Sequence, residues 1–133
     1  MDFNKMLNIG KMPIIILVAI GVLSLILGSI LPLGAVLIGL LSFVIGIIVY
    51  LWAGYLATKA KMSLIEAGVT GAIVAFISGL INGLIGLLYG MVTSGPNALA
   101  YVLTLGILLS GLIVGVIIGF VLGAIGGFIG QKF

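Results

Sequence analysis

The chain has 133 residues, of which 64% are hydrophobic and only 5% are charged. Soluble domains carry about 25% charged residues, so this composition excludes an ordinary soluble protein and indicates an integral membrane protein. The sequence contains no cysteine, no histidine and no arginine. Disulfides, thiol chemistry, imidazole bases and most transition-metal sites are therefore excluded.

Four apolar runs are each long enough to cross a bilayer, which takes about 20 apolar residues in a helix. They cover residues 13–31, 33–58, 63–92 and 97–130, and a cytoplasmic or interfacial N-terminal segment, residues 1–12, precedes them. Breaks are expected at Pro32, at the polar stretch 58–63 and at the turn residues 93–97. We therefore predict an all-α integral membrane protein, with a four-helix transmembrane bundle over residues 13–133.

Neither end of the sequence has the pattern of a single straight membrane-spanning helix. Phe3, Met6 and Leu7 have helical spacing, which fits either a short helix in the membrane interface or an irregular start. The last apolar run would extend about 50 Å as a helix, so it must tilt, kink or protrude from the bilayer. The adjacent glycines Gly126 and Gly127 are the expected place for a bend.

The lysines predict the orientation in the membrane, because cytoplasmic loops collect basic residues. Lys5 and Lys11 precede the first run, Lys59 and Lys61 separate the second from the third, and Lys132 follows the fourth. With four crossings, all five lie on one side. We expect a multi-pass protein of the cytoplasmic membrane with both termini in the cytoplasm. Lysines scattered singly make no surface for nucleic acid, so the bilayer is the expected partner.

Few polar side chains are expected at membrane depth. Glu66, the acid nearest a span, follows Ser63 by three residues, a spacing that predicts a capping box at a helix start. Four polar residues are candidates for interhelical contacts or for a pore lining: Ser78, Asn82, Thr104 and Ser110. Asn82 is the strongest, because a carboxamide in hydrocarbon needs an interhelical partner. No set of residues predicts a catalytic, metal or cofactor site.

The spacing of glycines predicts how the helices pack. Lipid is as apolar as leucine, so helices associate in bilayers through close packing at small residues. In the last run glycine recurs every fourth residue and turns by about 40° per step, so its groove winds and can contact two neighbours in succession. In the third run, glycines with Ala72 and Ala75 keep to one face. The predicted packing glycines are Gly68, Gly79, Gly83, Gly86, Gly90, Gly111, Gly115, Gly119, Gly123 and Gly127.

Two segments share a glycine pattern. VIGIIVYLWAG at 44–54 and IVGVIIGFVLG at 113–123 both have glycine at the third and last positions. Either a duplicated hairpin or a chance match between apolar sequences explains them.

Three stretches carry a family resemblance. The segment YLWAGYLATKAK precedes SLIEAGVTGAIVAFISGLINGLIG, and the glycine series GFVLGAIGGFIG closes the chain. Together, over roughly residues 50–130, they resemble small glycine-zipper four-helix membrane proteins of prokaryotic, archaeal type whose function is unknown. The resemblance implies a four-helix membrane fold and transfers no activity and no functional residue.

Two functions fit these observations. The first is a non-enzymatic structural or accessory membrane protein that packs against copies of itself or against other membrane subunits. The second is a small channel or solute pore lined by the four polar candidates. No pairing of nucleophile and base, metal ligands or acids favours an enzyme.

Overall fold

The computed structural model describes residues 2–30, 34–94 and 98–133. These residues form four α-helices and no strand: α1 (Phe3–Ile30), α2 (Ala35–Lys59), α3 (Leu64–Ser94) and α4 (Ala98–Lys132). Each helix is long and apolar enough to cross a membrane, as expected for a multi-pass membrane protein. The all-helical fold class is thereby confirmed, whereas the predicted breaks at Pro32 and Pro96 lie outside the described residues.

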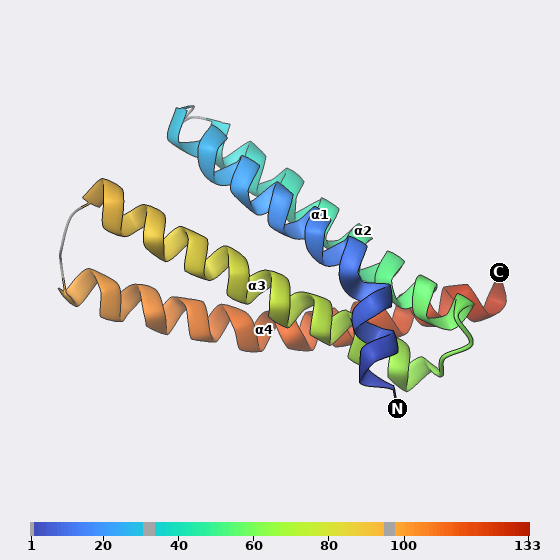
Figure 1. Cartoon of the computed structure of the whole chain (residues 1–133). Helices are drawn as coiled ribbons and strands as arrows, with labels where there is room; N and C mark the ends of the chain where they lie inside the picture. Colours follow the sequence, from blue (N-terminus) through green and yellow to red (C-terminus); the bar gives the residue numbers. More distant parts are fainter. Residues whose placement is uncertain (1, 31–33, 95–97) are drawn as a thin grey trace.

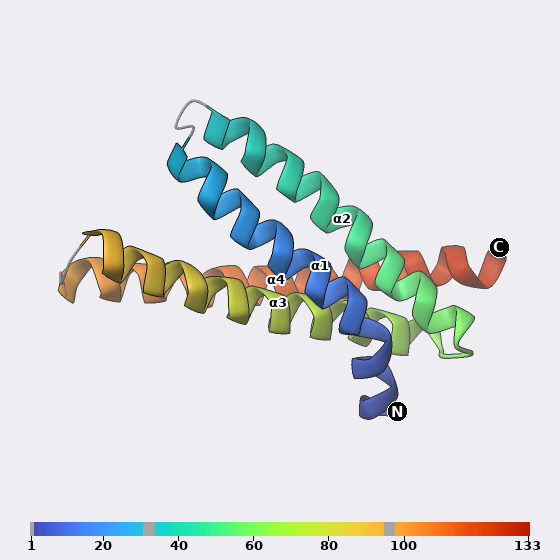
Figure 2. The same cartoon turned by 45° about the horizontal axis from the view of Figure 1, so that its top comes forward.

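The helices form two hairpins, α1 with α2 and α3 with α4, which meet at one end and diverge toward the other (Figures 1 and 2). Both termini and the α2–α3 connection lie at the joined end. We call it the lysine end because all five lysines belong to these segments, and we call the opposite end the far end. Contacts are most extensive between α3 and α4, and α2 crosses α4 near the lysine end. Within the described ranges, α1 and α4 do not contact each other.

Residues 3–12 are helical and belong to α1. The Met6 side chain is fully buried and packs against Ala57, Met62 and Ala67, so this first part of α1 closes the lysine end. The Lys5 ammonium donates a hydrogen bond of 2.8 Å to the Ala60 carbonyl at the end of α2. These contacts stabilise the helical conformation of this stretch. The sequence alone was compatible with either a helix or an irregular start.

Pro13 lies inside α1 and is fully buried. Proline has no N–H for the helix ladder and its ring crowds the preceding turn, which bends a helix. Figure 2 shows that α1 changes direction toward its N-terminus. The bend turns the first residues of α1 across the lysine end.

The connection between α2 and α3 is a Schellman turn. The Lys61 amide donates to the Thr58 carbonyl and the Met62 amide donates to the Ala57 carbonyl. Lys61 has a φ of 65°, the left-handed conformation that this turn requires. The burial of Met62 against Ala57 supplies the apolar contact that accompanies such turns.

The capping box predicted at the start of α3 is present. The Ser63 amide donates to a Glu66 carboxylate oxygen at 2.8 Å, and the Glu66 amide donates to the Ser63 hydroxyl at 3.2 Å. Glu66 thus satisfies the helix terminus, and its place in the structure is the one that the serine–glutamate spacing predicts.

Glycines let α4 approach two helices in the half nearest the lysine end. A Cβ on Gly119 would lie 2.6 Å from the Gly71 carbonyl oxygen of α3. A Cβ on Gly126 would lie 2.7 Å from the Leu51 carbonyl carbon of α2, and one on Gly54 would overlap the Gly123 backbone. Real Cβ atoms do not come so close, so the backbones touch where only glycine fits. Here α4 contacts α3 and α2 at neighbouring positions, as expected of a winding groove.

The α4 helix is not interrupted at Gly126 and Gly127, where a bend is expected. The α4 helix is continuous from Ala98 to Lys132. Gly126 faces the backbone of Leu51 and Gly127 faces the methyl group of Ala67, so neighbouring helices pack closely against both glycines. Glycine here supplies close approach and not flexibility.

Toward the far end the packing changes character. Gly79 and Gly83 of α3 lie against Leu112 and Leu108 of α4, so a leucine side chain separates the two backbones. Four of the predicted packing glycines have no non-local atom within 4 Å of a built Cβ: Gly86, Gly90, Gly111 and Gly115. Within the single chain these four glycines therefore receive no close contact from another helix. Gly71, which was not among the predicted packing glycines, makes a backbone contact instead.

The turn geometry predicts that Lys61→Gly stabilises the protein. A non-glycine residue in the left-handed conformation costs about 1 kcal/mol, and glycine removes that cost. We expect the free energy of unfolding in detergent to rise by about 1 kcal/mol in Lys61→Gly and to be unchanged in Lys61→Ala, which has also lost the charge. Equal stabilisation in both variants would assign the effect to charge and not to the turn.

The backbone contacts predict opposite effects for two alanine substitutions in α4. Gly126→Ala forces a methyl group into the Leu51 backbone and should destabilise the fold by about 1–3 kcal/mol, as overpacking does. Gly115→Ala meets open space and should be neutral or stabilising by up to about 1 kcal/mol, because alanine favours helix. Reversible unfolding of the two variants in mixed micelles measures the difference, and similar stabilities would contradict the close approach.

Candidate functional site between the two hairpins

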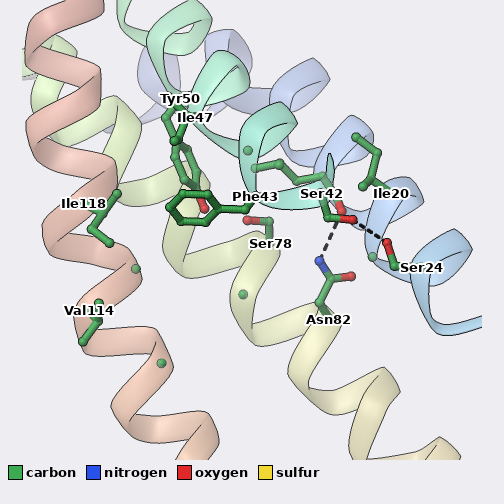
Figure 3. A pocket seen from close by; sticks show the side chains of 16 residues that line it. Ile20, Ser24, Ser42, Phe43, Ile47, Tyr50, Ser78, Asn82, Val114 and Ile118 are labelled. Atoms are coloured by element: carbon green, nitrogen blue, oxygen red, sulfur yellow. Dashed lines mark hydrogen bonds between the residues drawn. The ribbon is translucent and has the colours of Figure 1, made fainter. Parts of the chain in front are cut away.

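A cavity of about 430 Å³ lies where the hairpins begin to diverge, and side chains from all four helices line it (Figure 3). We call it the cleft cavity. Glycines make up part of its wall, which keeps the space open: Gly21, Gly46, Gly79, Gly111 and Gly115. Apart from these glycines and several aliphatic residues, its wall contains five polar side chains: Ser24, Ser42, Tyr50, Ser78 and Asn82.

Ser24 of α1 and Ser42 of α2 form a hydroxyl pair across the first hairpin. Their oxygens are 2.6 Å apart, and either can be the donor. Because one proton serves this bond, the second proton remains to bond elsewhere. The pair joins α1 to α2 and places hydroxyl groups in the cavity wall (Figure 3).

Asn82 connects α3 to α1. Its amide nitrogen donates a hydrogen bond of 3.2 Å to the Leu17 carbonyl, the interhelical partner that the sequence predicts for it. The side chain lies directly against Gly21, where any Cβ would overlap the carboxamide. Its Oδ1 atom is buried and has no hydrogen-bond partner among the described residues. An unpaired buried acceptor lowers the stability of a fold by about 1–3 kcal/mol.

Tyr50 reaches from α2 toward α3. Figure 3 shows its hydroxyl group pointing toward Ser78. Ser78 is buried and donates its own proton to the Val74 carbonyl at 2.6 Å. The Ser78 oxygen is thus left with acceptor capacity only, whereas the Tyr50 hydroxyl, which lines the cavity, can both donate and accept.

A second cavity of about 490 Å³ continues the cleft along α3 and α4. It shares four wall residues with the cleft cavity: Tyr50, Gly79, Gly111 and Gly115. Thr104 and aliphatic residues such as Leu87 and Ile107 complete its wall. The two spaces form one elongated recess, which we call the cleft with its groove.

Three of the four polar candidates from the sequence line the cleft with its groove, and the fourth does not. Ser78 and Asn82 line the cleft cavity, and Thr104 lines the second cavity. Ser110 is exposed on another face of α4 and donates to the Gly106 carbonyl at 2.9 Å. The sequence reasoning omitted Ser24, Ser42 and Tyr50 from the site. The contact between the two serines could have been predicted from the sequence. They lie eight positions before and ten positions after Pro32, which places them at similar depth in a hairpin.

The chemistry of the cleft is that of neutral hydrogen bonding. Among the residues lining it, the Tyr50 hydroxyl is the sole ionisable group, and it sits at membrane depth. No cluster of three or more histidine, cysteine, aspartate or glutamate side chains occurs within the described ranges. The site can therefore donate to and accept from uncharged groups.

Comparison with known proteins adds no family or relative to this picture. No family model matches the chain, and neither the curated proteins nor the solved structures include one with significant similarity. The geometry of the chain itself supports every functional inference that follows.

The contact between Gly21 and Asn82 predicts a selective destabilisation. Gly21→Ala places a methyl group in the Asn82 carboxamide and should cost about 1–3 kcal/mol of unfolding free energy. Gly28→Ala, seven residues later on the same helix face, meets no atom within 4 Å and serves as the matched control. In an Asn82→Ala background the cost of Gly21→Ala should largely disappear. A double-mutant cycle with no coupling would contradict the contact.

Proposed function

We propose that the protein is a non-enzymatic accessory membrane protein that associates through α4, with copies of itself or with another membrane subunit. The observation that supports this most directly is a groove of about 660 Å³ on the far half of α4. Its floor contains Gly106, Ser110 and Gly111, and no second helix of the chain contributes to it. We call it the α4 groove.

The contrast along α4 explains why this groove suits a partner helix. Near the lysine end, Gly119, Gly123 and Gly126 already receive α3 and α2, so their packing capacity is used. Toward the far end, a Cβ on Gly106 or Gly111 would meet no atom within 4 Å. Two small residues four apart, as at 106 and 110, let a second backbone come close, which is the main source of helix affinity in a bilayer.

The polar content of the groove also favours packing. The Ser110 hydroxyl already donates to the Gly106 carbonyl, so burying it leaves no donor unpaired. The flanking side chains Val102 and Ile107 are 65% and 74% exposed. A helix seated between them would gain dispersion contacts along both walls of the groove.

The location of the lysines supports the cytoplasmic membrane as the site of action. Figure 1 places both termini and the α2–α3 connection at one end, and these segments contain every lysine of the chain. Under the positive-inside rule we propose that this end faces the cytoplasm. The α4 groove, in the far half of the helix, would then lie in the outer half of the bilayer.

A pore through one copy has weaker support. Ser78 and Thr104 line the cleft with its groove, whereas Ser110 lines the α4 groove. Transport by a single copy would need a polar path that joins them.

The assembly role predicts that filling the α4 groove prevents association. A Cβ at position 106 meets open space, so Gly106→Leu should fill the floor of the groove, lower cross-linked or co-purified species and retain helicity. Gly28→Leu on α1, which also meets open space, is the matched control and should associate like wild type. Native mass spectrometry from native membranes measures the outcome. A monomeric wild type with no co-purifying protein would refute the role.

A further inference from the structure

The cleft with its groove has the dimensions of a small-molecule site. Its two parts measure about 430 Å³ and about 490 Å³ and share Tyr50, Gly79, Gly111 and Gly115 in their walls. Ligand pockets in proteins commonly span about 300–1,000 Å³ and are often found between the helices of bundles. One elongated molecule can therefore occupy both parts.

The polar groups concentrate in one part of the recess. The cleft cavity contains the Ser24–Ser42 pair, the Tyr50 hydroxyl and Asn82, whereas the second part is lined mainly by aliphatic side chains and glycines. The Asn82 side chain lies in the wall of this part, but its Oδ1 atom is buried against Gly21 and is not accessible from the cavity. The recess thus has one polar end and one apolar end.

We propose that this recess binds an uncharged membrane lipid whose head carries a hydroxyl group. A charged head is disfavoured because no charged side chain lines the cavity to compensate its desolvation. A hydroxyl both donates and accepts, so it can bond to the Tyr50 oxygen or to the Ser24–Ser42 pair. The apolar chain of the lipid lies along α3 and α4, in the groove beside Leu87 and Ile107. The polar part of this recess is distinct from the α4 groove of the assembly role, although Ile107, Gly111 and Val114 border both spaces.

Photolabelling of the full-length protein in detergent tests the proposal. The probe is hexadecanol with a diazirine in its chain, and the comparison probe is the hexadecane that carries the same diazirine and no hydroxyl. The alcohol should label Ile47, Val114 and Ile118 saturably, and excess plain hexadecanol should compete with it. The hydrocarbon should label exposed residues such as Ile113 and Ile117 without saturation.

Two variants of α2 provide a matched test of the location. Gly46 lines the cleft cavity and has no atom within 4 Å of a built Cβ, so Gly46→Leu fills the cavity and should abolish saturable labelling. Gly39→Leu lies seven residues earlier on the same helix face, also meets open space and does not line the cavity, so it should label like wild type. Circular dichroism checks that both variants fold.

A milder variant tests the hydrogen bonding. Ser42→Ala keeps the shape of the cavity and should raise the half-saturating alcohol concentration about two- to tenfold, the worth of one hydrogen bond. Equal saturable labelling by the alcohol and the hydrocarbon would overturn the hydroxyl head. Unchanged labelling in Gly46→Leu would overturn the cavity as the binding site.

Discussion

Contact between the backbones of α2, α3 and α4 near the lysine end is the constraint on which the rest of the structure depends. Gly54, Gly71 and Gly126 each leave room that a single methyl group would close. In a bilayer no hydrophobic force draws apolar helices together, so packing and hydrogen bonds must do so. The dense end holds the two hairpins in contact, and the positions where glycine faces another backbone determine where contact begins and ends.

The divergence of the hairpins follows from what α4 presents beyond that contact. Leu108 and Leu112 pack onto the glycines of α3 and keep the second hairpin paired, but α2 has no such partner on α4 there. The first hairpin is held instead by polar bonds from α1, through Ser24 to α2 and through Leu17 to Asn82 of α3. The recess between the hairpins is therefore bounded by hydrogen-bonded walls on one side and by exposed glycine backbone on the other.

The local features of this structure were predictable from the sequence, whereas the features that depend on helix crossing were not. Apolar length located the four helices, and the spacing of Ser63 and Glu66 located a cap, because each depends on neighbours in the chain. Asn82 needed an interhelical partner wherever it lay. Glycine spacing identified faces capable of close approach but could not tell Gly119, which meets α3, from Gly115, which meets nothing. That difference depends on where two helices cross. The crossing also determines that Tyr50 and Ser24 line the same cavity.

The crossing of α2 over α4 has a geometric consequence. Gly54 meets Gly123 at the crossing, and each helix has another glycine eight residues earlier, at Gly46 and Gly115, in the wall of the cleft cavity. Both helices run from the far end to the lysine end, so each of these glycines lies about 12 Å from the crossing along its helix. The angle at which α2 crosses α4 therefore determines the width of the cleft between them.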